Sequence, residues 1–307
     1  MELRHLRYFV AVAEEGHITR AAERLGMQQP PLSQQIKVLE KELDVQLFRR
    51  KARGVELTEA GRALLDDARA ILARVARAVE TTRRTARGEQ GRLCVGIPPT
   101  GPFHPFVPAV IRAFREAFPL VSVTLEECLR TEAIERLRDE QMDVAFLRTS
   151  MTAPEGLVIH PLLVEPMVVA LPSAHMLARS GCGGDGALSM KELAGETFVV
   201  YARQHGPAMY EALAAACHRA GFSPRVGQEA PRITSALGLV AAGFGVSLVP
   251  ASMQRMTMDG VEYRRLRGAA QPTAVLTLAS RRGDPSAPVR HFLNLVRRAA
   301  RNTDAGP

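Results

Sequence analysis

Apolar residues recur every three or four positions in the N-terminal part of the chain, the spacing that places them on one face of a helix. The first stripe predicts a helix that ends near Gly16, and its members are Leu3, Leu6, Phe9, Val10 and Ala13. A second stripe predicts a short helix over residues 18–25, closed by Gly26 because glycine tolerates the left-handed conformation of a helix cap. The chain therefore opens with two short amphipathic helices.

A third helix is expected to begin near Gln29, because the prolines that follow suit a first turn, where a missing amide has no intrahelical partner. Its apolar stripe consists of Leu32, Ile36, Leu39 and Leu43. The opposite face carries side chains that can donate hydrogen bonds to base edges or phosphates, namely Gln29, Ser33, Gln34 and Lys37. This helix is suited to the major groove of DNA.

Two short strands are expected after the third helix. Residues 45–48 and 55–57 are mainly apolar, and a turn at Gly54 lies between them. The same stretch contains the basic residues Arg49, Arg50, Lys51 and Arg53. The pattern predicts a basic β-hairpin, or wing, whose tip contacts phosphates or the minor groove. Because such contacts release counterions, binding is expected to weaken steeply as the salt concentration rises.

Several short motifs of this region resemble, in their order and spacing, those of LysR-type transcriptional regulators. The motifs include Ala21-Ala22-Glu23-Arg24-Leu25, Gln29-Pro30-Pro31-Leu32-Ser33, Leu39-Glu40, Leu47-Phe48 and Leu57-Thr58-Glu59-Ala60-Gly61. The resemblance implies a winged helix-turn-helix over residues 1–57 that binds double-stranded DNA. The residues assigned to DNA binding are Gln29, Pro30, Ser33, Gln34, Lys37, Arg50 and Arg53. Gln28, Gln34 and Asp44 depart from the family pattern, so helix capping and base preference are expected to differ.

A long helix is expected after Thr58, whose hydroxyl can accept a hydrogen bond from an amide of the first turn. Small and apolar residues then follow at intervals of three and four, the seam of a two-stranded coiled coil: Gly61, Leu64, Ala68, Ile71, Val75, Ala78 and Thr82. The simplest partner is a second copy of the chain, and the resemblance also implies a homodimer here and a homotetramer overall. The alternative is one amphipathic helix packed on its own domain. Residues 58–90 are interpreted as a dimerisation linker and hinge.

From residue 91 onward, short apolar strands alternate with helices, which predicts a parallel sheet with helices on both faces. The pattern occurs over residues 93–147 and again over residues 197–249, so two similar lobes are expected. Residues 162–164 and 273–279 are the expected crossings between them. The predicted fold class is multidomain, α+β and α/β: a winged helix-turn-helix, a long linker helix, and a two-lobed effector domain over residues 91–307 that resembles periplasmic binding proteins.

Ligands of open α/β sheets bind at the carboxyl ends of strands, near helix N-termini, so a site between the lobes is expected. The LysR-type resemblance implies an effector pocket formed by Thr100, Gly101, Arg130, Thr131, Arg148, Tyr201, Pro207, Ala208 and Ile233. Thr100 and the two arginines suit carboxylates. The opening residues 1–10 and residues 236–243 look like the subgroup that controls aromatic-compound catabolism, so the hypothesis is an aromatic acid or a ring-cleavage dicarboxylate. The alternative for each arginine is a solvated surface charge.

Composition limits the remaining possibilities. The net charge of +8 favours an anionic partner, but residues 1–57 hold only ten basic against eight acidic residues, so charge alone does not identify DNA. The cysteines Cys94, Cys128, Cys182 and Cys217 form no Cys-x-x-Cys pair, and neither a metal site nor a cofactor is expected. No signal peptide or membrane span is recognisable, which favours a cytoplasmic protein without a membrane partner.

Two other classes of protein share parts of this pattern. An α/β enzyme, or a cytoplasmic small-molecule-binding protein without a regulatory role, would suit the second half of the chain, but Gly-x-Ser-x-Gly, P-loop and His-Glu-x-x-His motifs are missing. His104 and His205, near the expected cleft, are interpreted as polar lining residues. A periplasmic solute-binding protein would suit the lobes but not the reading helix. The sequence therefore predicts a ligand-responsive transcription regulator that is not an enzyme.

Overall fold

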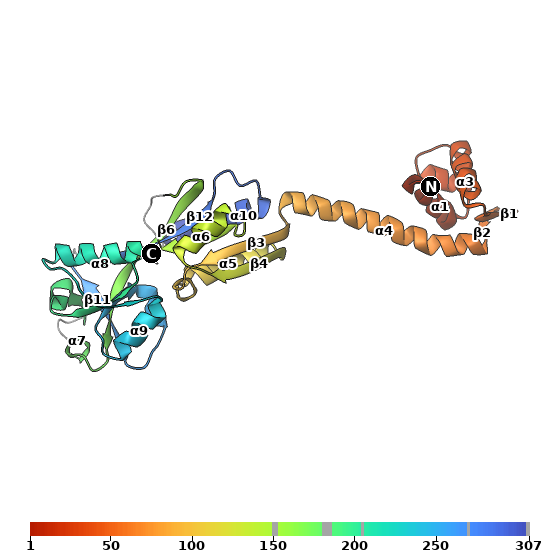
Figure 1. The fold of residues 1–307 in the computed structure, drawn as a ribbon. Helices are drawn as coiled ribbons and strands as arrows, with labels where there is room; N and C mark the ends of the chain where they lie inside the picture. The colour runs from red at the N-terminus through yellow and green to blue at the C-terminus, as the bar shows by residue number, and fades with distance from the viewer. Residues whose placement is uncertain (149–152, 180–185, 204–205, 269–270, 305–307) are drawn as a thin grey trace. The chain divides into compact units, whose positions relative to one another are not determined.

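The structure is a computed structural model that describes residues 1–148, 153–179, 186–203, 206–268 and 271–304 (Figure 1). The chain divides into two compact units, Met1–Thr85 and Ala86–Pro307, called here the N-terminal and the regulatory unit. Two residues considered above, Cys182 and His205, lie outside the described residues.

The N-terminal unit contains the three predicted helices, a two-stranded hairpin and a long fourth helix. The elements are α1 (Leu3–Glu15), α2 (Ile18–Arg24), α3 (Gln29–Leu43), β1 (Phe48–Lys51), β2 (Gly54–Leu57) and α4 (Glu59–Arg87). Gly16 and Gly26 adopt left-handed backbone conformations, with φ of +61° and +65°. The hydroxyl of Thr58 accepts a hydrogen bond from the amide of Gly61 at 3.0 Å, so Thr58 caps α4 as predicted.

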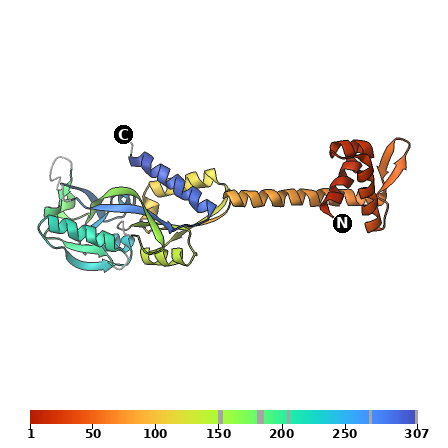
Figure 2. The same ribbon diagram turned by 90° about the horizontal axis from the view of Figure 1, so that it is seen from above.

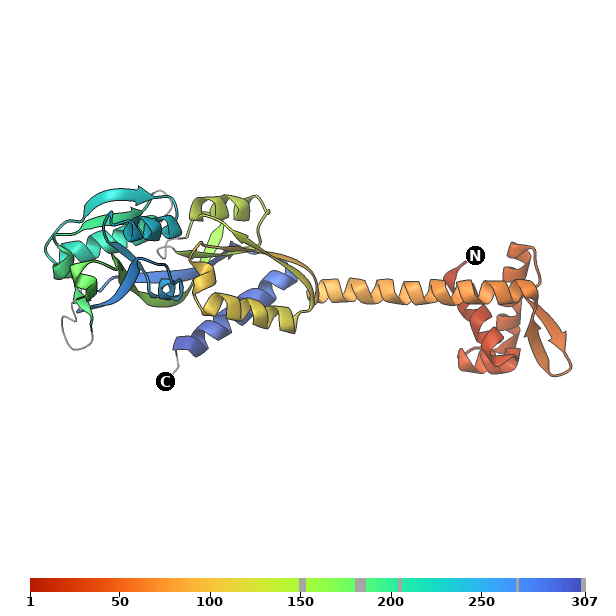
Figure 3. The same cartoon turned by 90° about the horizontal axis from the view of Figure 1, so that it is seen from below.

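The hairpin lies later in the chain than predicted. The amides of Leu47 and Phe48 donate to the carboxylate of Glu40 at 2.8 and 3.1 Å, which holds the chain against α3 up to that point. Strand β1 therefore covers Phe48–Lys51 rather than residues 45–48, and the basic residues occupy the strand. Of the four, only Arg53 lies in the turn. Figure 3 shows this hairpin projecting beside the helices of the N-terminal unit.

The first half of α4 belongs to the core of the N-terminal unit. Ala68 is fully buried, and an added Cβ on Gly61 would lie 2.2 Å from the carbonyl oxygen of Leu47. Leu64 and Leu72 also pack against this core. The alternative of a helix packed on its own domain is therefore correct for Gly61, Leu64 and Ala68, and a seam open to a partner begins only near Ile71, which is 40% exposed.

The regulatory unit has two lobes, each with a sheet and covering helices. The first lobe contains β3 (Gln90–Ile97), α5 (Phe106–Ala117), β4 (Leu120–Glu127), α6 (Arg130–Arg138), β5 (Val144–Arg148) and α10 (Ala287–Asp304). Helices α5 and α10 lie side by side (Figure 2), and Phe114 and Phe146 pack edge-on against Phe292 at ring distances of 5.2 and 6.1 Å. This aromatic cluster forms the centre of the first lobe.

The second lobe contains the elements predicted for it and several more. They are α7 (Met176–Arg179), β7 (Leu188–Ser189), β8 (Thr197–Tyr201), α8 (Pro207–Arg219), β9 (Arg225–Ala230), α9 (Ile233–Ala241), β10 (Ser247–Pro250) and β11 (Val261–Arg267). The described residues of the unit also contain three 3-10 helices: η1 (Gly101–Phe103), η2 (Met190–Leu193) and η3 (Ala251–Arg255).

Two long strands connect the lobes, and they correct the prediction of a parallel sheet. Strands β3, β4 and β5 are parallel, as are β8 and β9. However, β12 (Thr273–Arg281) pairs antiparallel with β5 and with β6 (Leu157–Pro172). The last residues of β6 pair antiparallel with β10 and β11 in the second lobe. Strand β6 therefore belongs to both sheets, and it changes from one to the other after Glu165 and Pro166.

Candidate functional site

The polar face of α3 is accessible, as the sequence predicts. Its apolar stripe is buried at Leu32, Ile36 and Leu39. The side chains on the other face are exposed at Gln29, Pro30, Gln34 and Lys37 and half-buried at Ser33. Gln28 occupies the N-cap of α3 without a side-chain hydrogen bond to the first turn, which agrees with its departure from the family pattern. Asp44 ends the helix with φ of +53°, a conformation that glycine adopts more easily.

A groove separates α3 from the hairpin. It encloses about 700 Å³, including the part open to solvent, and it brings together three of the predicted residues, Ser33, Lys37 and Arg50. Gln29, Pro30, Gln34 and Arg53 do not line it. Gln46 and Arg49 line the same groove and were not among the predicted site residues.

Among the described residues, two of the four basic side chains of the hairpin are paired with a carboxylate, and two are not. Glu56 accepts from Arg49 Nη2 at 2.9 Å and from Lys51 Nζ at 2.7 Å, and these partners lower the pKa of the Glu56 carboxyl. Within the described part of the chain, Arg50 and Arg53 have no carboxylate within 4.0 Å. The positive charge available to an anionic partner is therefore concentrated on Arg50 and Arg53, the two that the sequence assigned to DNA binding.

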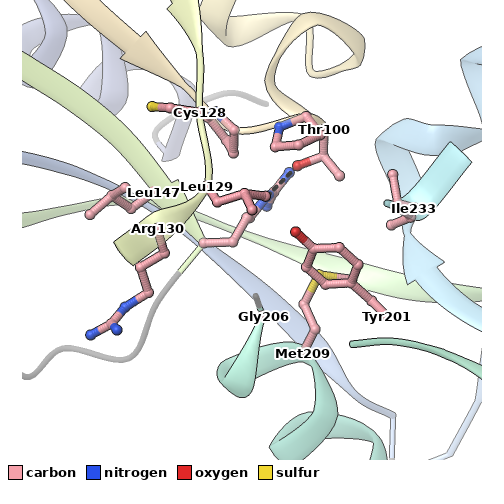
Figure 4. A pocket seen from close by; sticks show the side chains of 12 residues that line it. Thr100, Cys128, Leu129, Arg130, Leu147, Tyr201, Gly206, Met209 and Ile233 are labelled. Carbon is pink, nitrogen blue, oxygen red and sulfur yellow. Dashed lines mark hydrogen bonds between the residues drawn. The ribbon is translucent and has the colours of Figure 1, made fainter. Parts of the chain in front are cut away.

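A pocket lies between the two lobes of the regulatory unit (Figure 4). It encloses about 440 Å³, including its mouth, and is lined by Pro98, Pro99, Thr100, Cys128, Leu129, Arg130, Leu147, Arg148, Tyr201, Gly206, Met209 and Ile233. In Figure 4 the hydroxyl groups of Thr100 and Tyr201, from opposite lobes, point toward the same space.

Five of the nine predicted effector residues line this pocket: Thr100, Arg130, Arg148, Tyr201 and Ile233. Gly101 is buried beside Thr100 but does not line it, and Thr131 is exposed. Pro207 does not line the pocket, although its neighbour Gly206 does. Ala208 lines a separate hollow between α8 and β12. The structure therefore brings five of the predicted residues together in one pocket and leaves the other four outside its lining.

Arg148 is buried and already paired, so the alternative of a solvated charge is wrong for this residue. Its side chain is 7% exposed and forms an ion pair with Glu165, whose side chain is 10% exposed. Arg148 Nε also donates to Thr100 Oγ1 at 3.3 Å. Glu165 in turn accepts hydrogen bonds from the amide and the hydroxyl of Ser252, at 2.8 and 3.2 Å. A chain of polar contacts thus connects the first lobe to η3 of the second.

Glu165 was missed by the sequence analysis, although a signal was present. It is the single charged residue in the run Leu162–Leu171, and a buried carboxylate in an apolar strand requires a partner. His104 stands beside it, with Nε2 at 3.9 Å from Glu165 Oε1. Burial lowers the pKa of His104, and Nδ1 accepts the amide of Phe106 at 3.2 Å, so the neutral ring carries its proton on Nε2, facing Glu165.

Comparison with known proteins identifies both units. Residues 3–62 match the bacterial regulatory helix-turn-helix of the lysR family, and residues 86–301 match the LysR substrate binding domain. The chain belongs to the LysR family. Among its relatives, BudR of Raoultella terrigena is 38% identical over 96% of this chain and 100% of that protein. AlsR of Bacillus subtilis is 36% identical over the full length of both chains.

A solved LysR-family structure has the same fold. The crystal structure of full-length CbnR complexed with its target DNA superposes with a TM-score of 0.83 at 31% identity, over 98% of this chain and 100% of that one. The relatives are transcription regulators and not enzymes. The protein is therefore a DNA-binding transcription regulator of the LysR type, and the helix-turn-helix of the N-terminal unit is its DNA-binding element. Within the described residues, every helix is too short or too polar to span a bilayer.

Proposed function

We propose that this LysR-family regulator is switched by a small organic acid, an aromatic acid or a dicarboxylate, bound in the pocket between the two lobes. The observation that carries the proposal is the buried guanidinium of Arg148 at the pocket wall, next to the hydroxyl of Thr100. Both groups can donate to a carboxylate oxygen in a water-poor site. Because the protein binds DNA, the cytoplasm is the compartment we propose for it.

The proposed DNA-reading unit is a homodimer formed through the exposed part of α4, and two dimers assemble into a tetramer. Ile71 and Val79 expose 40% and 45% of their surface on α4, and Val75 lies between them. A single reading helix covers few base pairs, whereas a dimer engages two half-sites together. The effector acts by favouring one arrangement of the lobes over another, which changes the spacing of the DNA-binding units.

Footprinting tests the switch. An operator is first selected from random duplexes by the full chain, and its protection is then mapped without and with benzoate or cis,cis-muconate. We expect an acid to shorten or shift the protected region because a ligand that binds one arrangement better changes its population. Identical protection at saturating concentrations of both acids, combined with no binding in calorimetry, would refute an anionic effector.

Two substitutions on α3 test the DNA contacts. Lys37→Ala is expected to weaken binding to all duplexes alike and to lower the salt slope by about 1, because the ammonium group is assigned to a phosphate. Gln29→Ala is expected to relax the choice of one base pair, a loss of about 1–3 kcal/mol of discrimination. Titrations of the selected operator and of single-base variants at several salt concentrations measure both effects. If Lys37→Ala instead relaxed the choice of base and Gln29→Ala weakened binding to all duplexes alike, the two assignments would have to be exchanged.

A further inference from the structure

The guanidinium of Arg148 is not fully satisfied by the protein. Nη2 is paired with Glu165 and Nε with Thr100, but Nη1 is buried without a hydrogen-bond partner among the described residues. A buried donor that is left unpaired costs free energy, and native proteins rarely retain one without a role. Arg148 lines the pocket between the lobes, so a ligand that binds there lies beside a guanidinium that still has an unused donor.

The charge of Arg148 is nevertheless compensated within the protein. The carboxylate of Glu165 supplies one negative charge, and the pair as a whole is neutral. Two further lining groups that can ionise are uncharged: burial raises the pKa of Cys128 to about 11, and burial also raises the pKa of Tyr201. The neutral ring of His104 completes the surroundings of Glu165.

Among the described residues, Arg148 is the one cation whose guanidinium lies beside Thr100 at the pocket wall. Arg130 lines the pocket, but Figure 4 shows its guanidinium turned away from Thr100, Tyr201 and Ile233. The positive charge of Arg232 partly offsets the effect of burial on the pKa of Tyr201, and that of Arg255 adds to the effect of burial in lowering the pKa of His104, but neither arginine lines the pocket. The rest of the wall is mainly apolar: Pro98, Pro99, Leu129, Leu147, Met209 and Ile233.

We propose that the effector is a small monocarboxylate with an apolar body, and that Glu165 is the residue that excludes a second negative charge. One carboxylate oxygen accepts from Arg148 Nη1 and from the hydroxyl of Thr100, while the apolar body packs against Met209 and Ile233. The first carboxylate is stabilised by the unused donor of the Arg148 guanidinium, whereas a second carboxylate would be buried against the apolar wall with no cationic donor, which is strongly unfavourable. This inference rests on the proposed function and selects the aromatic acid over the dicarboxylate.

Calorimetry of the full chain with two matched pairs of acids tests the proposal. The pairs are benzoate with phthalate and butyrate with succinate, which share a carbon skeleton and differ by one carboxylate. We expect wild type to bind a monocarboxylate at least about tenfold more tightly than its dicarboxylate partner. Glu165→Gln keeps the shape and one of the two acceptor oxygens but leaves Arg148 uncompensated, so the preference is expected to vanish or reverse. Glu262→Gln, which removes an exposed carboxylate of β11, is the matched control and should keep the wild-type ratio.

The outcomes separate this proposal from the proposed function. A dicarboxylate that binds wild type as tightly as its monocarboxylate partner, or an unchanged ratio in Glu165→Gln, overturns the role of Glu165 while an anionic effector remains. Failure of all four acids to bind, with no change in the footprint, overturns the anionic effector itself. If Glu165→Gln does not fold by circular dichroism, Arg148→Lys replaces it: loss of monocarboxylate binding with operator binding kept supports the proposal, and retained binding refutes it.

Discussion

Replacing Arg148 alone with methionine is expected to destabilise the regulatory unit by about 3–5 kcal/mol, because it leaves the buried carboxylate of Glu165 without its cation. The hydrogen bonds from Ser252 remain, but they do not neutralise the charge. The chain contains no tryptophan, so unfolding in urea is followed by far-ultraviolet circular dichroism, and the transition of the regulatory unit is compared between variants.

The double variant Arg148→Met with Glu165→Leu provides the control. Replacing both members of a buried ion pair by apolar residues of similar volume is often neutral or stabilising, so most of the loss should be recovered. Recovery identifies the unpaired charge as the cause. If the double variant is as unstable as Arg148→Met, the loss comes from packing around Arg148, and the ion pair contributes little.

Introducing glutamate at Ile71 is expected to separate the dimer and to weaken operator binding by about 100-fold or more, because two linked half-sites bind with far higher avidity than one. Ile71 is the first exposed apolar residue of the α4 seam, and a buried carboxylate facing its own symmetry mate would be unpaired and repelled. Sedimentation velocity measures the molecular mass, and gel-shift titrations measure the affinity.

Ala73→Glu is the matched control for this substitution. It adds the same charge to an exposed position of α4 on the face opposite Ile71, so the mass and the affinity should stay close to wild type. An Ile71→Glu protein that remains dimeric would place the dimer contact elsewhere. An equal loss in both variants would show that added charge on α4, and not the seam, weakens binding.

The helices of the N-terminal unit could be predicted because each has its own apolar stripe and its own stop signal. Gly16 and Gly26 end α1 and α2 through backbone conformations that the residue type itself favours. The position of the hairpin could not be predicted in this way. Its start depends on Glu40, which binds the amides of Leu47 and Phe48 from a different element.

The pocket was found by a topological rule, whereas its electrostatics depend on long-range pairing. Thr100 and Arg148 follow or end strands of one sheet, so their convergence could be expected. Glu165 meets Ser252 only because β6 crosses between the sheets, and no local pattern encodes that contact. The crossings at residues 162–164 and 273–279 were predicted and lie in β6 and β12, but the full length of β6 and its antiparallel partners were not. Pro161 and Pro166 obscure the strand pattern of β6 in the sequence, and its partners lie about a hundred residues later.

The position of the first half of α4 determines how this regulator can be recombined. Gly61, Leu64 and Ala68 complete the core of the helix-turn-helix. A chimaera joined at residue 57 would remove these residues from the core and is expected to destabilise the helix-turn-helix. A chimaera that carries residues 1–85 transfers the whole N-terminal unit, with its core intact. A DNA-binding unit that is transferred to another regulator to change its operator must therefore include the first half of α4, which makes no predicted DNA contact.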